Sequence, residues 1–494
     1  MFADYLLDYI SASYYNKILL LDDEGLALTA GVPDKLMALG FDVVIYKDDL
    51  SFRIEHETKL KSDEVKIVVI ANSKNYIPYD VRRRLRSYFI SLNNLFPKLN
   101  IDVLREQDEL DFELLCMAYK KNFDKLTSRK QTEDFLQNKV YGKENIVDHV
   151  TALALELKKK TTMATSYSDW IAVSEIKATL DVLATQHQIE VDTQYVNEAF
   201  CVFALQNFGK LSSEISLQMP VLVSRAMEYM ADRSKKYVVV VMDGMSKFDW
   251  RILSDSFRGL KYTQSATFAM IPTTTSVSRQ CLLSGKYPSQ LSEPWKQNKE
   301  RQEFVSCAKS LGFADNQIGY ERGYDAQFNS FVRCGAVIIN DIDDIVHAQQ
   351  QGRLGMFNDI RVLRDQHKLY DMVCRFLSDG FDVFITADHG NTPCRGLGKL
   401  IGTGLEVETK SRRMLVLQDF ANKDVLLKKY DMIDYPKYYL KKDYDYLICK
   451  VGDSFDAKDE DVMTHGGISI DEVIVPFITI KAVDNIGKNS GICM

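Results

Sequence analysis

The chain has 494 residues, and its hydrophobic fraction of 46% and charged fraction of 27% exclude a disordered protein and indicate two or three folded domains. Its formal net charge of −7 argues against strong non-specific binding of duplex DNA, which depends on clustered Lys and Arg, but leaves room for a local basic groove. The nine cysteines include no C-x-x-C pair, which argues against a disulfide framework or a cysteine zinc site and favours a reducing compartment.

No segment of the sequence predicts export or a membrane partner. The first residues, MFADYLLDYISASYYNK, lack a basic region, and Asp4 and Asp8 interrupt the apolar run, so we expect no signal peptide. The longest apolar stretches, such as YVVVVM, are far shorter than the roughly 20 residues that span a bilayer. We therefore predict a cytoplasmic protein that does not associate with membranes.

The first hundred residues alternate between strand-like and helix-like segments. KILLLDDEG, GFDVVIYKDD and VKIVVIAN, which begin at Lys17, Gly40 and Val65, have the composition of buried strands. VPDKLMAL has helical spacing, and YIPYDVRRRLRSYF has the pattern of a loop that enters a helix. This alternation predicts a small parallel α/β module over residues 1–100.

Residues 101–233 have a helical pattern. Apolar residues recur every three or four positions in LDVLATQHQI and VNEAFCVFALQNF. The one proline of this region, Pro220, stands where a helix could begin. We predict a helical region, to which the sequence assigns no role.

From residue 234 to residue 494 the sequence returns to an α/β pattern. YVVVVMDGMS and DVFITADHGN each contain an apolar run that ends near a carboxylate and a glycine, and MLVLQDF and DEVIVPFITI supply further strands. Continuous apolar runs are typical of strands covered on both faces, so we predict a doubly wound sheet. Ligands of such sheets bind beyond the carboxyl ends of the strands, and Asp243, Asp388 and His389 lie at those ends.

Three of the seven histidines lie in motifs with a second ligand-type residue or with glycines. The other four are interpreted as surface or packing residues: His56, His149, His187 and His367. NDIDDIVHAQQ places Asp343 and His347 four residues apart, so a helix would put both side chains on one face, able to hold one ion. Asp341 and Asp344 are competing candidates without this spacing, and a surface ion pair has the same pattern.

The other two histidine motifs follow or precede strands. TADHG places Asp388 and His389 side by side, and both reach one site only if the chain turns there, which Gly390 would allow. THGG gives His465 followed by two glycines, which let the backbone approach an ion or anion closely, although an ordinary turn has the same sequence.

IPTTTSVSRQCLLSGKYP places three threonines before a short predicted helix. A hydroxyl at a helix N-terminus meets free backbone N–H groups and the positive end of the helix dipole, both suited to a phosphate. A simple N-cap is the alternative interpretation. A bound dication would favour the phosphate-binding interpretation, because the ion lowers the pKa of a hydroxyl and makes it a nucleophile.

The ordered motifs MDGM, PTTTSVSR, DxxxH, TADHG and THGG resemble the alkaline phosphatase superfamily, and within it the PglZ-domain branch associated with bacterial phage-defence (BREX) loci. The resemblance runs from about Lys236 to the C-terminus, roughly half of the chain. YIPYDVRRRL also looks like the α/β segment that precedes PglZ domains. The resemblance implies a doubly wound catalytic domain of alkaline phosphatase type over residues 234–494.

The resemblance further implies two divalent metal ions, zinc or alternatively manganese. One ion would be held by Asp343, His347 and His465, and the other by Asp243, Asp388 and His389. Thr275 matches the nucleophile position of the superfamily, with Thr274 as the fallback. Ser278 matches the position of a polar phosphate contact in relatives, and Arg279 could assist by its charge, although either could merely begin the helix.

By the same resemblance we expect a phosphodiesterase or phosphatase, with a nucleotide or oligonucleotide as the favoured substrate and other defence-system proteins as partners. Two alternatives stay open. The chain could be a non-catalytic scaffold of a defence complex, for which the long helical region provides partner surfaces. It could also be a signalling protein with a receiver-like module, because Asp22 and Asp23 end the first predicted strand; however, the third strand ends in Ala71 and Asn72, neither of which can form an acyl phosphate.

Overall fold

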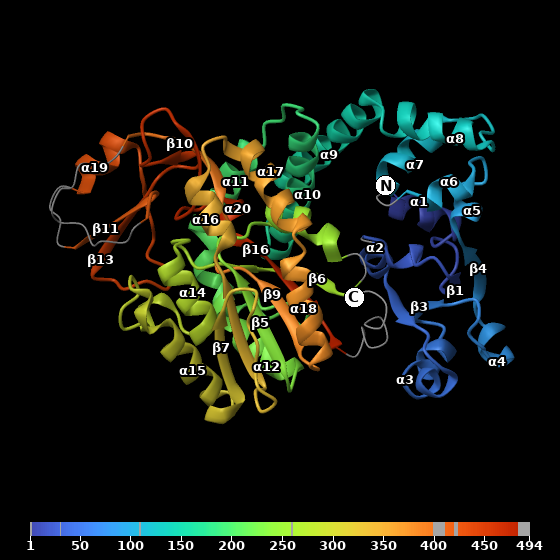
Figure 1. The fold of residues 1–494 in the computed structure, drawn as a ribbon, viewed down its shortest axis with the longest axis horizontal. Coiled ribbons are helices and arrows are strands. Elements are labelled where there is room, and N and C mark those ends of the chain that lie inside the picture. The colour runs from blue at the N-terminus through green and yellow to red at the C-terminus, as the bar shows by residue number, and fades with distance from the viewer. Residues whose placement is uncertain are drawn as a thin grey trace. The chain divides into compact units, whose positions relative to one another are not determined.

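The computed structural model describes residues 2–29, 31–107, 110–257, 260–398, 411–418 and 423–482; Cys493 lies outside these ranges. The chain divides into two compact units, Met1–Ala152 and Leu153–Met494 (Figure 1). Within the described ranges, no helix combines the length and the apolar character needed to cross a membrane.

The first unit is built on a four-stranded parallel sheet. Its strands are β1 (Lys17–Asp22), β2 (Phe41–Ile45), β3 (Lys66–Ala71) and β4 (Arg86–Ile90), in the order β2-β3-β1-β4. The helices that accompany them are α1 (Phe2–Tyr9), α2 (Val32–Ala38), α3 (Asp49–Lys61), α4 (Tyr79–Arg82), α5 (Leu92–Leu95), α6 (Ile101–Arg105), α7 (Phe112–Lys121) and α8 (Arg129–Phe135). The three predicted strands and the helix over VPDKLMAL are all present.

Two features of this unit differ from the sequence-based expectation. YIPYDVRRRLRSYF forms only the single turn of α4 and then the edge strand β4, because RSYFI ends in the β-favouring residues Tyr88, Phe89 and Ile90. The sheet order also differs from the receiver-type order 2-1-3-4-5, since β1 lies between β3 and β4. The receiver-like interpretation is therefore wrong in topology.

Helices dominate residues 143–233, as the apolar spacing predicted. They are α9 (Lys143–Met163), α10 (Tyr167–Gln186), α11 (Gln194–Asn207) and α12 (Ala226–Arg233). A short 3₁₀ turn over Val223–Arg225 precedes α12, so the last helix begins a few residues after Pro220.

The second unit contains a six-stranded sheet in the order β6-β16-β9-β5-β8-β7. These strands are β5 (Tyr237–Met242), β6 (Thr263–Phe268), β7 (Ile318–Arg322), β8 (Cys334–Ile339), β9 (Asp382–Thr386) and β16 (Ile474–Ile480). Every residue of β5 and β8 is buried, so both faces of the sheet are covered, as in an α/β doubly wound fold. The surrounding helices are α13 (Lys247–Leu253), α14 (Thr275–Ser284), α15 (Glu300–Ser310), α16 (Asp341–Ala348), α17 (Gly352–Asp365), α18 (Lys368–Ser378) and α20 (Ile470–Val473) (Figure 1).

The sheet is mixed, because β16 runs antiparallel to both of its neighbours, β6 and β9. MLVLQDF does supply a strand, β11 (Met414–Gln418), but this strand joins a separate antiparallel sheet with β13 (Tyr444–Ile448) and β12 (Ile433–Asp434), near helix α19 (Lys423–Tyr430). The third sheet of this unit, which is also three-stranded, contains β10 (Thr392–Gly396), β14 (Asp453–Ser454) and β15 (Asp461–Thr464).

Candidate metal centre

The topology brings three acidic segments to one edge of the six-stranded sheet. Strand β5 pairs in parallel with β9 on one side and β8 on the other, so their carboxyl ends lie together. Asp243 directly follows β5, Asp388 follows β9, and α16, which carries Asp343, follows β8. Adjacent parallel strands thus explain why residues far apart in the sequence meet.

The six predicted ligand residues form two groups. In each group the candidate ligand atoms all lie within 4.8 Å of one another. The groups are Asp343, His347 and His465, and Asp243, Asp388 and His389. The stacked rings of His389 and His465, whose centroids are 4.1 Å apart, connect the two groups.

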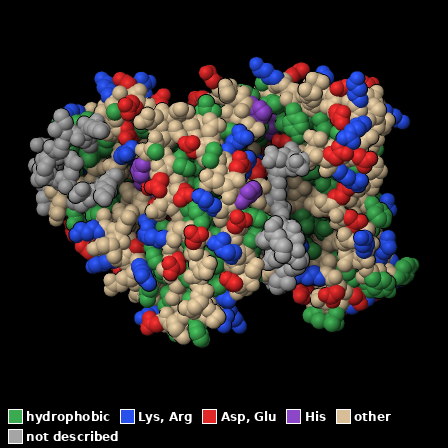
Figure 2. Space-filling model, in the orientation of Figure 1, with side chains coloured by type: hydrophobic (Ala, Val, Ile, Leu, Met, Phe, Trp, Pro, Cys, Tyr) green, Lys and Arg blue, Asp and Glu red, His purple; other side chains and the backbone are tan. Residues whose placement is uncertain are grey.

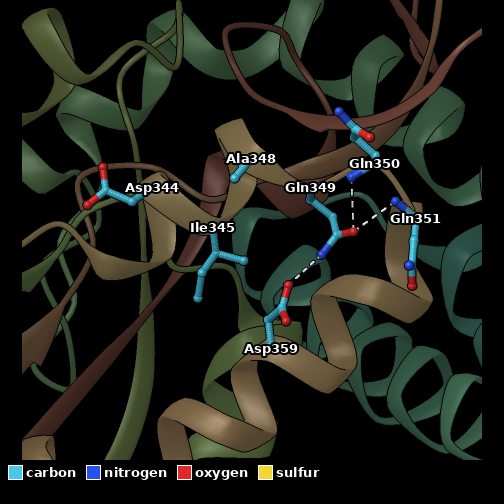
Figure 3. A pocket seen from close by; sticks show the side chains of 7 residues that line it. All are labelled: Asp344, Ile345, Ala348, Gln349, Gln350, Gln351 and Asp359. Carbon is cyan, nitrogen blue, oxygen red and sulfur yellow. Dashed lines mark hydrogen bonds between the residues drawn. The ribbon is translucent and has the colours of Figure 1, made fainter.

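Helix α16 presents Asp343 and His347 on one face, as their spacing predicted. His347 Nε2 is 3.4 Å from Asp343 Oδ2, and His465 Nε2 is 3.4 Å from Asp343 Oδ1. The His347 side chain is 39% exposed, so this group is open to solvent on one side. The competing candidate Asp344 lies instead at the rim of a separate pocket, and its carboxylate extends away from the other residues that line it (Figure 3).

That pocket, with a volume of about 560 Å³, belongs to the turn between α16 and α17 and contains none of the six residues. Its lining residues are Asp344, Ile345, Ala348, Gln349, Gln350, Gln351 and Asp359. Gln349 closes the turn, because its Oε1 accepts the N–H groups of Gln350 and Gln351 while its Nε2 donates to Asp359 at 2.6 Å (Figure 3).

Backbone carbonyls orient the two buried histidines. His389 Nδ1 lies 3.0 Å from the carbonyl oxygen of Gly390, and His465 Nδ1 lies 2.9 Å from that of Thr273. An Nδ1–H that donates to a carbonyl leaves Nε2 with its lone pair free, which is how metal-binding imidazoles are held in proteins. Both Nε2 atoms are directed at the acidic groups.

The carboxylates have unsatisfied atoms that suit a cation. One oxygen of each of Asp243, Asp343 and Asp388 is buried and has no hydrogen-bond partner among the described residues. A buried, unpaired carboxylate oxygen is costly unless a cation neutralises it. The imidazole nitrogens and carboxylate oxygens together fit zinc and also admit manganese.

Burial and neighbouring charges shift the pKa values of the second group, Asp243, Asp388 and His389, so that the neutral forms are favoured. Burial raises the pKa of Asp243, although the Arg279 guanidinium opposes this effect. Burial, together with the adjacent Asp243, raises the pKa of Asp388 well above its usual value. Burial and the charge of His465 hold the pKa of His389 well below its usual value, so its ring is neutral.

In the first group, the attraction between Asp343 and the histidines outweighs burial and favours the charged forms of Asp343 and His465. Burial alone would raise the pKa of Asp343, but the adjacent imidazoles of His347 and His465 lower it below its usual value. Burial would lower the pKa of His465, but the Asp343 carboxylate prevails and raises it. Asp343 is therefore ionised, and His465 holds its proton more tightly than a free histidine.

Thr275 is the first residue of α14, and its hydroxyl faces the second group. Its Oγ1 lies 3.0 Å from His389 Nε2. Thr275 is partly exposed, whereas its neighbours from Ile271 to Gln280 are buried. Thr274, the fallback nucleophile, is the N-cap residue, but its buried hydroxyl makes no capping bond. The side chain at the N-cap position therefore does not cap this helix.

Ser278 and Arg279 are buried and already bonded to the protein. The Ser278 hydroxyl donates to the carbonyl of Asp388 at 2.5 Å and accepts the N–H of Met270 at 3.0 Å. Arg279 bonds to Asp243 Oδ2 at 2.5 Å and to Glu300 Oε2 at 2.6 Å. Sequence reasoning expected phosphate contacts here, and the geometry connects both side chains to the ligand segments instead.

A family model of the BREX system PglZ alkaline phosphatase-like domain matches residues 223–480, more than half of the chain. The chain belongs to the PglZ family. The matched range contains both acidic–histidine groups and helix α14. No curated protein sequence matches the PglZ chain.

Solved structures with weak similarity to this PglZ protein were also found. Murine ectonucleotide pyrophosphatase/phosphodiesterase 5, in an inactive form with AMP, has 12% identity and a TM-score of 0.37 over 50% of this chain and 88% of that chain. Human ectonucleotide pyrophosphatase/phosphodiesterase 5 has 13% identity and a TM-score of 0.38, over 50% of this chain and 90% of that chain. Phosphonoacetate hydrolase from Sinorhizobium meliloti 1021, with phosphonoformate, has 11% identity and a TM-score of 0.32 over 50% and 90%.

Sequence reasoning missed Glu472, which holds the THGG loop of the PglZ domain. Its carboxylate accepts the N–H groups of Gly467 at 2.8 Å and Ser469 at 3.0 Å, and the hydroxyl of Thr273 at 3.3 Å. The Arg413 guanidinium also contacts it, and both side chains are fully buried. The S-x-x-E pattern at Ser469 was a detectable signal, because it predicts a capping box.

Two glycines have specific geometric roles near the ligands. Gly466 has φ = +111°, a conformation that residues with a Cβ rarely adopt. Gly390 was expected to allow a turn, but its φ is not positive. A Cβ at Gly390 would lie 2.0 Å from the carbonyl oxygen of Asp471, so this position requires glycine for close backbone packing.

We expect Arg413→Met to lower the free energy of unfolding by about 3–5 kcal/mol, because Glu472 would remain buried without its cation. The adjacent Arg412 is the matched control, since its side chain is 40% exposed in a 3.0 Å pair with Asp456. Arg412→Met should cost less than about 1 kcal/mol. Urea unfolding of both variants measures the difference, and equal small losses would contradict the role given to Arg413.

We also expect metal binding to release protons. Asp388, whose pKa lies well above its usual value, and His465, whose pKa is raised, lose protons when they become ligands, whereas Asp343 and His389 are already in the ligand form. Affinity should therefore rise with pH. Calorimetric titration with Zn²⁺ at about pH 6 in two buffers of different ionisation enthalpy should give a release of about one proton or more. A heat that does not depend on the buffer would contradict this expectation.

Proposed function

We propose that this protein is a metal-dependent phosphoric ester hydrolase with Thr275 as its nucleophile. The observation that carries the proposal is the position of the Thr275 hydroxyl. It lies at the start of an uncapped helix, 3.0 Å from His389, beside two groups of three ligand-type side chains. A structural metal site has no need of a partly exposed hydroxyl in that place.

In this proposal, Thr275 Oγ attacks the phosphorus atom and gives up its proton, while the bond from phosphorus to the leaving oxygen breaks. The leaving oxygen takes a proton and departs as an alcohol. Water then attacks the phosphothreonine, which releases the phosphate product and restores the hydroxyl. Two bound divalent ions, zinc or manganese, would stabilise the charge that develops on the attacking and leaving oxygens.

The chain itself supplies binding and orientation for these steps. The first N–H groups of α14, to which the N-cap side chain makes no bond, are available to the phosphoryl oxygens, except that of Val277, which donates to the Thr274 carbonyl at 3.1 Å. The carbonyls of Gly390 and Thr273 fix the imidazoles of His389 and His465.

We assign Ser278 and Arg279 to positioning rather than to substrate contact. Ser278 fixes the backbone of Asp388 against helix α14, and Arg279 holds one oxygen of Asp243 while the other stays free. Glu300 holds Arg279 in turn, and Tyr320 and Arg322 both donate to Glu300. This chain of contacts runs from the ligand Asp243 toward the surface at Arg322.

The substrate that we propose is a phosphodiester such as a nucleotide or an oligonucleotide, by analogy with the PglZ branch. The same analogy supports other defence-system proteins as partners. The cytoplasm is the compartment that we propose, in keeping with eight described cysteines that are buried and form no disulfide with one another.

We expect Thr275→Ala to lower the hydrolysis of bis-p-nitrophenyl phosphate by on the order of 10³-fold or more, because the attacking oxygen is lost. Thr275→Ser should retain activity. Metal content, measured by mass spectrometry, should stay near that of the unaltered protein. The hydrolysis rates of the unaltered protein and of both variants are measured with added zinc and, separately, with added manganese.

Thr274→Ala is the matched control for this experiment, because it removes the neighbouring hydroxyl that does not face His389. It should leave the rate within about threefold of the original. Loss of activity in Thr274→Ala with retention in Thr275→Ala would move the nucleophile to Thr274. Metal binding without turnover of monoesters, diesters or nucleotides by the unaltered protein would favour the scaffold alternative.

A further inference from the structure

The segment Lys74–Phe89, KNYIPYDVRRRLRSYF, has a charge and composition unlike the rest of the chain. We call it the Arg–Tyr segment. It contains five basic residues and one acidic residue, interleaved with four aromatic residues. It connects β3 to the edge strand β4 through α4, within the first unit.

The backbone of the Arg–Tyr segment is fixed. Val81 and Leu85 belong to the buried core of this unit, and Ile77 packs against it, so every fourth residue is an anchor. The carbonyl of Tyr76 accepts a hydrogen bond from the Tyr46 hydroxyl at 3.1 Å. The one acidic residue, Asp80, receives two bonds of 3.0 Å from the Arg53 guanidinium.

The basic side chains and most of the aromatic side chains of the segment are exposed. Tyr76 is 80% exposed and Tyr79 is 79% exposed. Arg82, Arg83 and Arg84 are exposed, and no carboxylate partner is found for them within the described ranges. By contrast, Arg53, Arg105 and Arg129 of the same unit each pair with an acidic side chain.

Strand β4 continues this surface along the open edge of the sheet. Arg86 lies over two aromatic rings, with its Cζ 5.6 Å from the centroid of Tyr15 and 6.0 Å from that of Tyr88. Tyr14 is 86% exposed and Phe89 is 53% exposed. Figure 2 shows basic and hydrophobic side chains next to one another at the corner where Figure 1 labels α4.

We propose that the Arg–Tyr segment binds single-stranded nucleic acid. Exposed arginines neutralise backbone phosphates, and exposed tyrosine rings stack on unpaired bases, whose faces a duplex hides. A rigid backbone lowers the entropic cost of ordering the binding groups. The net charge of −7 is compatible with this local surface, because the positive charge is confined to one segment.

Charge alone does not distinguish this surface from a solvated face. The chain offers a comparison in Lys158, Lys159 and Lys160 of α9, which are also consecutive, basic and exposed. Near them the sequence has no interleaved aromatic residues. An acidic protein partner would also suit exposed Arg and Tyr side chains, which are enriched at protein interfaces, so the test compares nucleic acid with polyglutamate.

The test is fluorescence anisotropy of the full chain with a labelled oligothymidylate of about 20 nucleotides, in EDTA so that metal-dependent hydrolysis does not consume the probe. We expect Arg82→Gln/Arg83→Gln/Arg84→Gln to weaken binding about 10-fold or more and to reduce the log–log salt slope by about 2. Lys158→Gln/Lys159→Gln/Lys160→Gln removes the same charge and should change the affinity less than about 2-fold.

A second pair of variants tests stacking. Tyr79→Ala should weaken binding by about 5-fold or more, whereas Tyr79→Phe, which keeps the ring, should bind like the original. Thermal unfolding checks that each variant is folded. Hydrolysis of bis-p-nitrophenyl phosphate should be unchanged in all of them, since the proposed surface is independent of Thr275.

Three results would overturn the proposal. The first is no measurable binding of the oligonucleotide by the unaltered protein. The second is an equal effect of the arginine and lysine variants, or equally tight binding of a matched duplex. The third is tighter binding of polyglutamate that depends on the arginines but not on Tyr79, which would indicate an acidic protein partner.

Discussion

The convergence of three carboxylates, Asp243, Asp343 and Asp388, at one edge of the six-stranded sheet governs the architecture around it. Each has a buried oxygen that makes no hydrogen bond to the described part of the chain, and neighbouring carboxylates that lose their water repel one another. One guanidinium, that of Arg279, lies among them, and Glu300 shares it. Burial and this repulsion raise the pKa values of Asp243 and Asp388, and a bound dication would take the place of the protons.

The elements that carry these ligands were largely predictable from the sequence. The apolar runs before Asp243 and Asp388 predicted buried strands, and the four-residue spacing of Asp343 and His347 predicted one helix face. Such signals are local and physical, because a covered strand must be apolar throughout and a helix repeats every 3.6 residues. Strand-end placement then limited where the ligands could meet.

Other features depend on contacts between distant segments, which local patterns do not encode. The local sequence does not show whether an arginine near the start of a helix is exposed or, like Arg279, is buried against a carboxylate. Gly390 reads as a turn residue, although its backbone packs against Asp471. MLVLQ reads as another strand of the main sheet, but it pairs with β13 elsewhere. RSYFI ends in β-favouring residues, but the helical pattern before it concealed the strand, which pairs with β1.

Strand β16 is the last strand of the sheet in sequence but lies inside it, between β6 and β9. During synthesis on a ribosome, the gap for this strand therefore stays open until residues 474–480 have emerged. His465 and Glu472 emerge just before them, after the other five candidate ligand residues and Thr275. A nascent chain thus carries most of the site in an unfinished sheet, and the order of translation delays its completion until almost the whole domain has been made.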